Sequence, residues 1–136
     1  MQKSKMPRVE WAFFCERAER DEGNFLNITK LLHTIQAIAN PDIGINFDFV
    51  FGLDGEPLSK HRLELKVVRP SGHFKVLGPL EIQFNASGFF DGNVEMKGMP
   101  IAETGDYRME FRFDGESTPS HVATLRVLPA HLDVSR

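Results

Sequence analysis

Side chains that could perform chemistry are few in this sequence and lie far apart. The histidines are isolated from one another, at His33, His61, His73, His121 and His131. None has the i, i+4 spacing with which a helix presents two imidazoles to a metal. The sequence also lacks a Gly-x-Ser-x-Gly elbow, which would expose an activated serine, and a glycine-rich loop that could cradle phosphates. We therefore predict a non-catalytic protein, with no catalytic residue, no cofactor and no metal.

The single cysteine, Cys15, lies in an alternating apolar run, which predicts a buried, inert thiol rather than a nucleophile. One cysteine excludes an internal disulfide. No segment approaches the ~20 apolar residues of a membrane span, and residues 1–5 lack the apolar stretch of a signal peptide. These features predict a cytoplasmic protein that does not bind membranes.

Four acidic residues occur in the segment from Glu16 to Glu22. Calcium binds oxygen-rich loops of this kind at the ends of β-sandwiches. Arg17 and Arg20 offset half of the negative charge, and the alternating Asp/Asn spacing of a calcium loop is missing. We therefore interpret the segment as a solvated loop.

Five basic residues could form an anion-binding stripe, if the two strands that carry them are neighbours: Lys60, Arg62, Lys66, Arg108 and Arg112. Only Glu64 and Glu110 would interrupt such a stripe, which could hold a phosphate-bearing ligand. We favour an exposed face with cross-strand ion pairs. We do not expect nucleic acid as a partner, because the net charge is −3 and no aromatic residues interleave the cations.

The elements that must position these residues are strands. Apolar and polar residues alternate with period two in successive runs, of which the clearest are 8–15, 45–53, 60–67, 80–84, 107–113 and 122–128. The chain has 136 residues, enough for one domain. We predict a single antiparallel β-sandwich of about eight strands, of Ig-like, Greek-key character, over residues 8–129, with a flexible N-terminal tail (1–7) and a C-terminal tail (130–136). Residues 29–39 could form a short helix or a strand.

Two aromatic residues are predicted to be buried and to stabilise the fold rather than to bind a ligand. Trp11 is in step with Val9, Phe13 and Cys15, so we expect its ring to be largely buried in the core. Gly105-Asp106-Tyr107 is typical of a tyrosine corner, in which a buried ring sends its hydroxyl back to a nearby backbone group.

The order of short motifs resembles a family of short bacterial proteins known only as a domain of unknown function. The resemblance rests on Val9–Cys15, Gly23–Ile28, His33–Ile35, His61–Leu65, Arg69–Gly72, Thr104–Arg108 and Phe113–Glu116. It implies a compact all-β domain with no assigned activity, cofactor or catalytic residue. The chain has Lys30-Leu31-Leu32 where that family usually has a glycine-rich bend.

Phe89 and Phe90 are adjacent phenylalanines that we place between two strands. Neighbours in an extended chain point to opposite sides, so one ring should leave the core, either to plug the end of the sandwich or to form a contact surface. Val122 lies on the polar side of the last expected strand. Together Phe89, Phe90 and Val122 predict a homodimer or a complex with another protein.

The sequence therefore predicts a binding or assembly module of unknown partner. The alternatives are a small enzyme, or an anion- or nucleic-acid-binding domain, whose site forms only in three dimensions.

Overall fold

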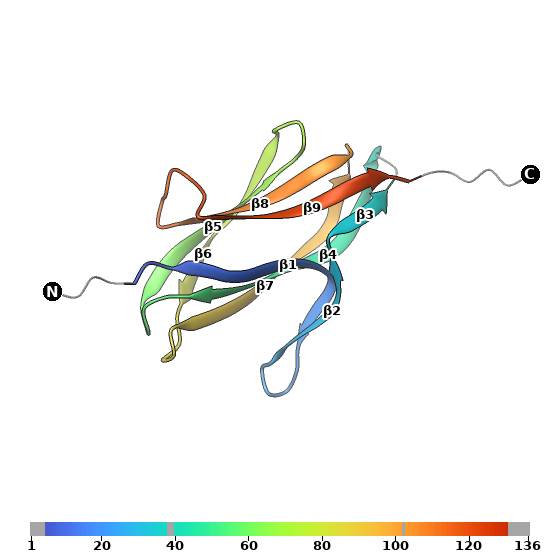
Figure 1. The fold of residues 1–136 in the computed structure, drawn as a ribbon. Helices are drawn as coiled ribbons and strands as arrows, with labels where there is room; N and C mark the ends of the chain where they lie inside the picture. Colours follow the sequence, from blue (N-terminus) through green and yellow to red (C-terminus); the bar gives the residue numbers. More distant parts are fainter. Residues whose placement is uncertain (1–4, 38–39, 102, 131–136) are drawn as a thin grey trace, which may run out of the picture.

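The computed structural model describes residues 5–37, 40–101 and 103–130. These residues form nine strands and no helix (Figure 1): β1 (Arg8–Arg20), β2 (Leu26–Leu32), β3 (Thr34–Ala37), β4 (Asn40–Asp54), β5 (Lys60–Val68), β6 (Phe74–Gln83), β7 (Phe89–Ile101), β8 (Gly105–Phe113) and β9 (His121–Pro129). No helix that could cross a membrane is found among them.

The strands form two sheets, with the orders β2-β1-β4-β7 and β3-β9-β8-β5-β6. The predicted β-sandwich is thus confirmed, with nine strands rather than about eight. The expectation that every strand pair is antiparallel fails for one pair, because β3 pairs with β9 in parallel. Among the described residues, the strands begin at Arg8 and end at Pro129. β1 and β9 run in the same direction, so the start of β1 and the end of β9 lie at opposite ends of the molecule (Figure 1).

The segment from Leu26 to Ala37 passes from one sheet to the other. It forms β2 at the edge of the four-stranded sheet, bends at His33, and continues as β3 beside the last strand of the other sheet. The ambiguous segment 29–39 is therefore extended as far as Ala37; residues 38 and 39 lie outside the described part of the chain. Lys30 has a φ of +57°, the left-handed conformation that favours glycine.

Each of the strands that supply most of the core has one apolar and one polar side, and the apolar side chains fill the space between the sheets. β4 contributes Phe47, Phe49, Phe51 and Leu53, all of which are at most 3% exposed. Their partners across the sandwich come mainly from β5 and β8 and include Leu63, Leu65, Phe111 and Phe113. Tyr107 is also buried, and its hydroxyl donates a 2.7 Å hydrogen bond to the Glu103 carbonyl, as the tyrosine-corner interpretation predicts.

The prediction that Trp11 lies in the main core is wrong, because β1 is irregular near its start. Its pairing with β4 shifts by one residue between Val9 and Trp11. A shift of one residue moves the following side chains to the opposite face. Val9 therefore packs on the main core, whereas Trp11 and Phe13 lie on the outer face of the four-stranded sheet and are only half-buried.

The segment predicted to lie between two strands is part of one. Phe89-Phe90 opens β7, and Asp91-Gly92 continues it. Gly92 faces the Phe51 ring, which would lie 2.8 Å from a Cβ atom at this position. This close approach explains a glycine within the strand.

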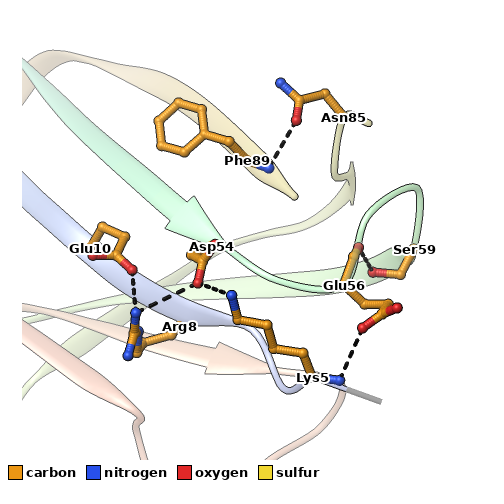
Figure 2. Close-up of polar contacts among 8 residues, drawn as sticks. All are labelled: Lys5, Arg8, Glu10, Asp54, Glu56, Ser59, Asn85 and Phe89. Atoms are coloured by element: carbon orange, nitrogen blue, oxygen red, sulfur yellow. Dashed lines mark hydrogen bonds and ion pairs between the residues drawn. The ribbon is translucent and has the colours of Figure 1, made fainter. Parts of the chain in front are cut away.

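The first described residues are tied to the end of the sandwich (Figure 2). The Lys5 ammonium pairs with Asp54, and the Lys5 backbone N–H donates a long, 3.4 Å hydrogen bond to Glu56. Arg8 contacts both Glu10, at 2.6 Å, and Asp54, at 3.6 Å. Residues 5–8 are thus anchored to the loop that joins β4 to β5.

Candidate functional site

Aromatic rings lie on the outer face of the four-stranded sheet. Trp11 and Phe13 stack with their centroids 5.9 Å apart and their planes at 17°. The Trp11 ring lies directly on Gly52 of β4, where a Cβ atom would be 2.3 Å from it. Phe89 is half-buried and faces the same side, because it pairs with Asp54 while the adjacent Phe90 points inward. We call Trp11, Phe13, Phe89 and Gly52 the aromatic face.

The hairpin of β1 and β2 bends over part of this sheet. Arg20 donates to both the Asp91 carbonyl, at 3.0 Å, and the Asp91 carboxylate, at 2.7 Å. β4 lies between β1 and β7, so this contact requires that the end of β1 cross the outer surface of β4. The buried Asp48 carboxylate accepts a 2.6 Å hydrogen bond from the Ala18 N–H and fixes the bend.

The prediction of a buried thiol is confirmed. Cys15 is fully buried under the hairpin, together with Val50 and Ala18. Burial raises the pKa of the thiol above its ordinary value, and the nearby Asp48 carboxylate raises it further. Cys15 is thus held in its neutral, weakly nucleophilic form.

The three residues predicted as an interaction surface do not lie together. Phe90 packs on the core beside Phe51, with ring centroids 6.3 Å apart. Phe89 belongs to the aromatic face, whereas Val122 is 41% exposed on the outer face of the other sheet. Phe90 is thus the ring that stays with the core, and Phe89 is the ring that leaves it.

Sequence reasoning missed the apolar residues of the β1–β2 hairpin that are exposed: Phe25 (71%), Ile28 (38%) and Leu31 (47%). It also missed the outward orientation of Trp11 and Phe13. The available signal was the unbroken apolar run from Trp11 to Cys15, which is typical of a strand with two apolar faces.

The five predicted cations lie on the five-stranded sheet, on neighbouring strands β5 and β8, but acids interrupt them. Lys66 pairs in register with Glu110, and Glu64 with Arg112. Arg112 also contacts Glu110 at 2.9 Å. We call this surface the charged face.

The remaining cations of the predicted stripe have other neighbours. Arg62 faces Glu81 across the β5–β6 pair, Lys60 faces Gln83, and Arg108 faces Val68 and Thr124. Lys66 also lies over the Phe74 ring, 3.8 Å from its centroid. Acids and bases alternate along the centre of this surface, which favours mutual neutralisation over an anion site, although the ion pair formed there, Arg112–Glu110, lies within β8 rather than across strands. Anion binding remains a prediction.

Most of the acidic segment from Glu16 to Glu22 is strand rather than loop, because β1 continues to Arg20. Asp21 caps the hairpin turn by accepting hydrogen bonds from the N–H groups of Gly23 and Phe25. The bond from Phe25 is the main cause that lowers the pKa of this carboxyl. In the described part of the chain, no three His, Cys, Asp or Glu side chains gather as metal ligands would.

One cluster that the sequence did not predict has the connectivity of a catalytic triad. His61 Nδ1 lies 2.7 Å from the Asp114 carboxylate, and His61 Nε2 lies 3.1 Å from the Ser59 hydroxyl. Partial burial alone would raise the pKa of Asp114, but hydrogen bonds from the Arg62 N–H and from His61 outweigh it, so this pKa is lowered. A hollow of about 340 Å³ adjoins His61 and Asp114.

The hydrogen bonds of this cluster favour a structural link. The Ser59 hydroxyl donates its only proton to the Glu56 carbonyl at 2.7 Å (Figure 2), so that proton is not directed at His61. The N–H groups of Leu58 and Ser59 are bonded to the carbonyls of Asn85 and Glu56, so neither is free to stabilise an oxyanion. His61 therefore joins the β4–β5 loop to the end of β8.

The chain is a β-sandwich with one aromatic and one charged outer face. The chain belongs to the Family of unknown function (DUF6941), whose model matches residues 10–128. No curated protein matches it.

Two solved structures contain a similar fold. The chain matches the Pseudomonas fluorescens alkylpurine DNA glycosylase AlkC bound to DNA containing an abasic site analog, with a TM-score of 0.57 and 13% identity, over 89% of this chain and 30% of that one. It also matches the GH3 β-glucosidase of Bifidobacterium adolescentis, with a TM-score of 0.54 and 8% identity, over 97% of this chain and 19% of that one. The chain thus spans less than a third of either protein, and at these identities the likeness concerns the fold alone.

Proposed function

We propose that this chain is a non-catalytic assembly module that associates with a second copy of itself through the aromatic face and the neighbouring edge of β2. The observation that carries the proposal is the Trp11–Phe13 stack on the outer face of the sheet, which is only partly buried within the chain and lies beside the strand that carries the exposed Ile28 and Leu31. Exposed apolar patches of this kind are typical of protein contact surfaces.

Three features favour a second copy as the occupant. β2 ends its sheet, so two β2 edges can pair about a twofold axis. Leu31 and Ile28 are exposed on that strand. Charges beside the face are already paired within the chain, as Arg20–Asp91, Lys30–Glu16, Arg8–Glu10 and Lys97–Glu95. Repulsion between copies would therefore be small.

Light scattering at micromolar concentration tests the proposal. We expect a dimer for the wild-type protein and a monomer for Leu31→Lys, because a cation at the edge strand opposes pairing. Val122→Lys is the matched control, since Val122 is similarly exposed on the other sheet, and it should remain dimeric. A monomeric wild type, or a Leu31→Lys dimer, would contradict the proposal; in the first case a different protein becomes the candidate partner.

A hydrolase is the second candidate function, and only the Ser59–His61–Asp114 geometry favours it. A fluorophosphonate probe labels serines that a histidine activates. We expect no labelling, because the Ser59 proton is donated to Glu56. Labelling that is lost in Ser59→Ala would instead establish an activated nucleophile.

We also propose a reducing cytoplasm as the setting and a bacterial origin. The buried thiol of Cys15 supports the first, and the resemblance described above supports the second. The Ig-like, Greek-key character of the sandwich is likewise proposed; it is supported by the pairing of β4 with β7 and of β5 with β8.

A further inference from the structure

A groove opens between the two sheets on the side where β6 and β7 form their edges. Its volume is about 480 Å³, within the range of specific ligand sites. We call it the β6–β7 groove. Its walls include apolar side chains that also pack on the main core, among them Val67, Leu77, Met96 and Met99. Methionine side chains adapt to varied apolar partners, which suits a wall that another chain contacts.

We propose that the β6–β7 groove binds an extended acidic peptide, which adds as a strand to the free edge of β7. The site is separate from the aromatic face and does not depend on the dimer proposed above. β7 is the last strand of its sheet, so one edge has no strand partner among the described residues. Seven consecutive residues, Val94 to Pro100, line the groove along this edge. The pairing of β7 with β4 shifts within this stretch, Gly98 has a φ of +62°, and Pro100 has no N–H, so the regular part that can accept a strand is Val94 to Lys97. At about 3.3 Å per residue it offers roughly 13 Å of backbone to an added strand.

The edge of β6 on the opposite wall is less suited to accept a strand. Pro79, near the middle of β6, has no N–H to donate. Lys75 pairs in register with Val67, which places its side chain on the inward side of the edge. Inward-pointing lysines discourage strand addition, so β7 is the edge that remains.

The charges of the groove indicate what kind of peptide it takes. Arg69, His73 and Lys75 line one end, and no ion pair to Arg69 or Lys75 occurs within the described residues. Glu95 on the other wall is paired with Lys97 at 3.3 Å. The chain as a whole carries a net charge of −3, so this cationic end is a local feature. A strand on β7 would direct alternate side chains inward, where apolar groups meet Leu77 and Met96 and carboxylates meet Lys75 and Arg69.

Selection from a random dodecapeptide library displayed on phage tests the proposal with an unbiased probe. We expect enriched sequences in which Asp or Glu alternates with apolar residues. A fluorescently labelled peptide of this kind should bind Lys75→Glu about tenfold more weakly than wild type, because the substitution reverses one charge of the contact. Lys60→Glu is the matched control: it reverses an exposed lysine on the neighbouring strand β5, outside the groove, and should bind unchanged.

Hydrogen exchange of the wild-type complex locates the peptide without any substitution. We expect slower exchange of the amides between Val94 and Lys97, because hydrogen bonds to the peptide would protect them. The proposal is overturned if the library yields no enriched sequences or basic ones, if Lys75→Glu and Lys60→Glu bind alike, or if protection falls on β2 or β6 instead of β7.

Discussion

The outer faces of the two sheets expose different kinds of side chain to water. On the charged face, acids and bases alternate between β5 and β8, and Glu110 lies between Lys66 and Arg112. On the aromatic face, Trp11 covers Gly52 with Phe13 stacked beside it, and a small second core forms beneath the bent hairpin. The charged side chains of the charged face are solvated favourably without a partner, whereas the aromatic face leaves apolar area in water. The two faces should therefore respond differently to the same kinds of substitution.

The largest difference is expected from truncation. Trp11→Ala should lower the free energy of unfolding by about 2 kcal/mol, the cost of removing a half-buried ring from its contacts. Arg108→Ala on the charged face should change it by less than about 0.5 kcal/mol, as exposed substitutions do. Urea unfolding followed by circular dichroism measures both. Equal effects would show that the two faces do not differ in this way.

A smaller effect is expected where Trp11 meets β4. Gly52→Ala places a methyl group against the ring and should cost about 1 to 2 kcal/mol through overpacking. The ring should also lift toward solvent, which shifts the emission of the only tryptophan to longer wavelength. Thr124→Ala on the outer side of β9 is the control. An unchanged emission spectrum in Gly52→Ala would show that the Trp11 ring does not lie on Gly52.

Acid should lower the free energy of unfolding, because Asp114 at the end of β8 loses its charge. The pKa of Asp114 is lowered in the folded chain, so its stabilising effect is complete above the ordinary carboxyl pKa of about 4 and is lost as pH falls through the lower native value. Because the Asp114 side chain is 44% exposed, solvent screening limits the effect to less than about 1 kcal/mol. Unfolding measured at pH 7 and pH 3 should show a smaller loss in Asp114→Asn than in wild type. The same loss in both proteins would assign the acid sensitivity to other groups.

The smallest effect is expected for Val122→Lys. Val122 pairs in register with Glu110, so the new ammonium gains an acidic neighbour. The free energy of unfolding should rise or fall by no more than about 0.5 kcal/mol. If urea unfolding shows that Val122→Lys lowers the free energy of unfolding by several times that amount, the Val122 side chain makes apolar contacts that the lysine disrupts.

The strands with one polar side were predictable, and β1 was not. In β8 polar residues occupy every second position, and in β4 large apolar residues do so from Ile45 to Leu53, so each pattern assigns the inner side. β1 is apolar at five successive positions, Trp11 to Cys15, and the shift in its pairing near Val9 depends on contacts with β4 that no local pattern encodes. The aromatic face was therefore missed.

The links between distant residues could be predicted only in part. The opposite charges that face each other across β5 and β8 follow from the alternating pattern, once these strands are taken as neighbours. His61 and Asp114 are 53 residues apart, and their contact depends on the register of β5 against β8. The β6–β7 groove depends on which strands end each sheet, which is a property of the whole topology.

The common direction of β1 and β9 has a mechanical consequence. A tensile force applied between Arg8 and Pro129 would pull the two strands along their own axes, toward opposite ends of the molecule (Figure 1). β1 would slide against β2 and β4, and β9 against β8 and β3, so each strand is loaded in shear along two ladders. Hydrogen bonds loaded in shear must break together rather than one after another. The sandwich should therefore resist stretching more strongly than a hairpin that unzips from its end.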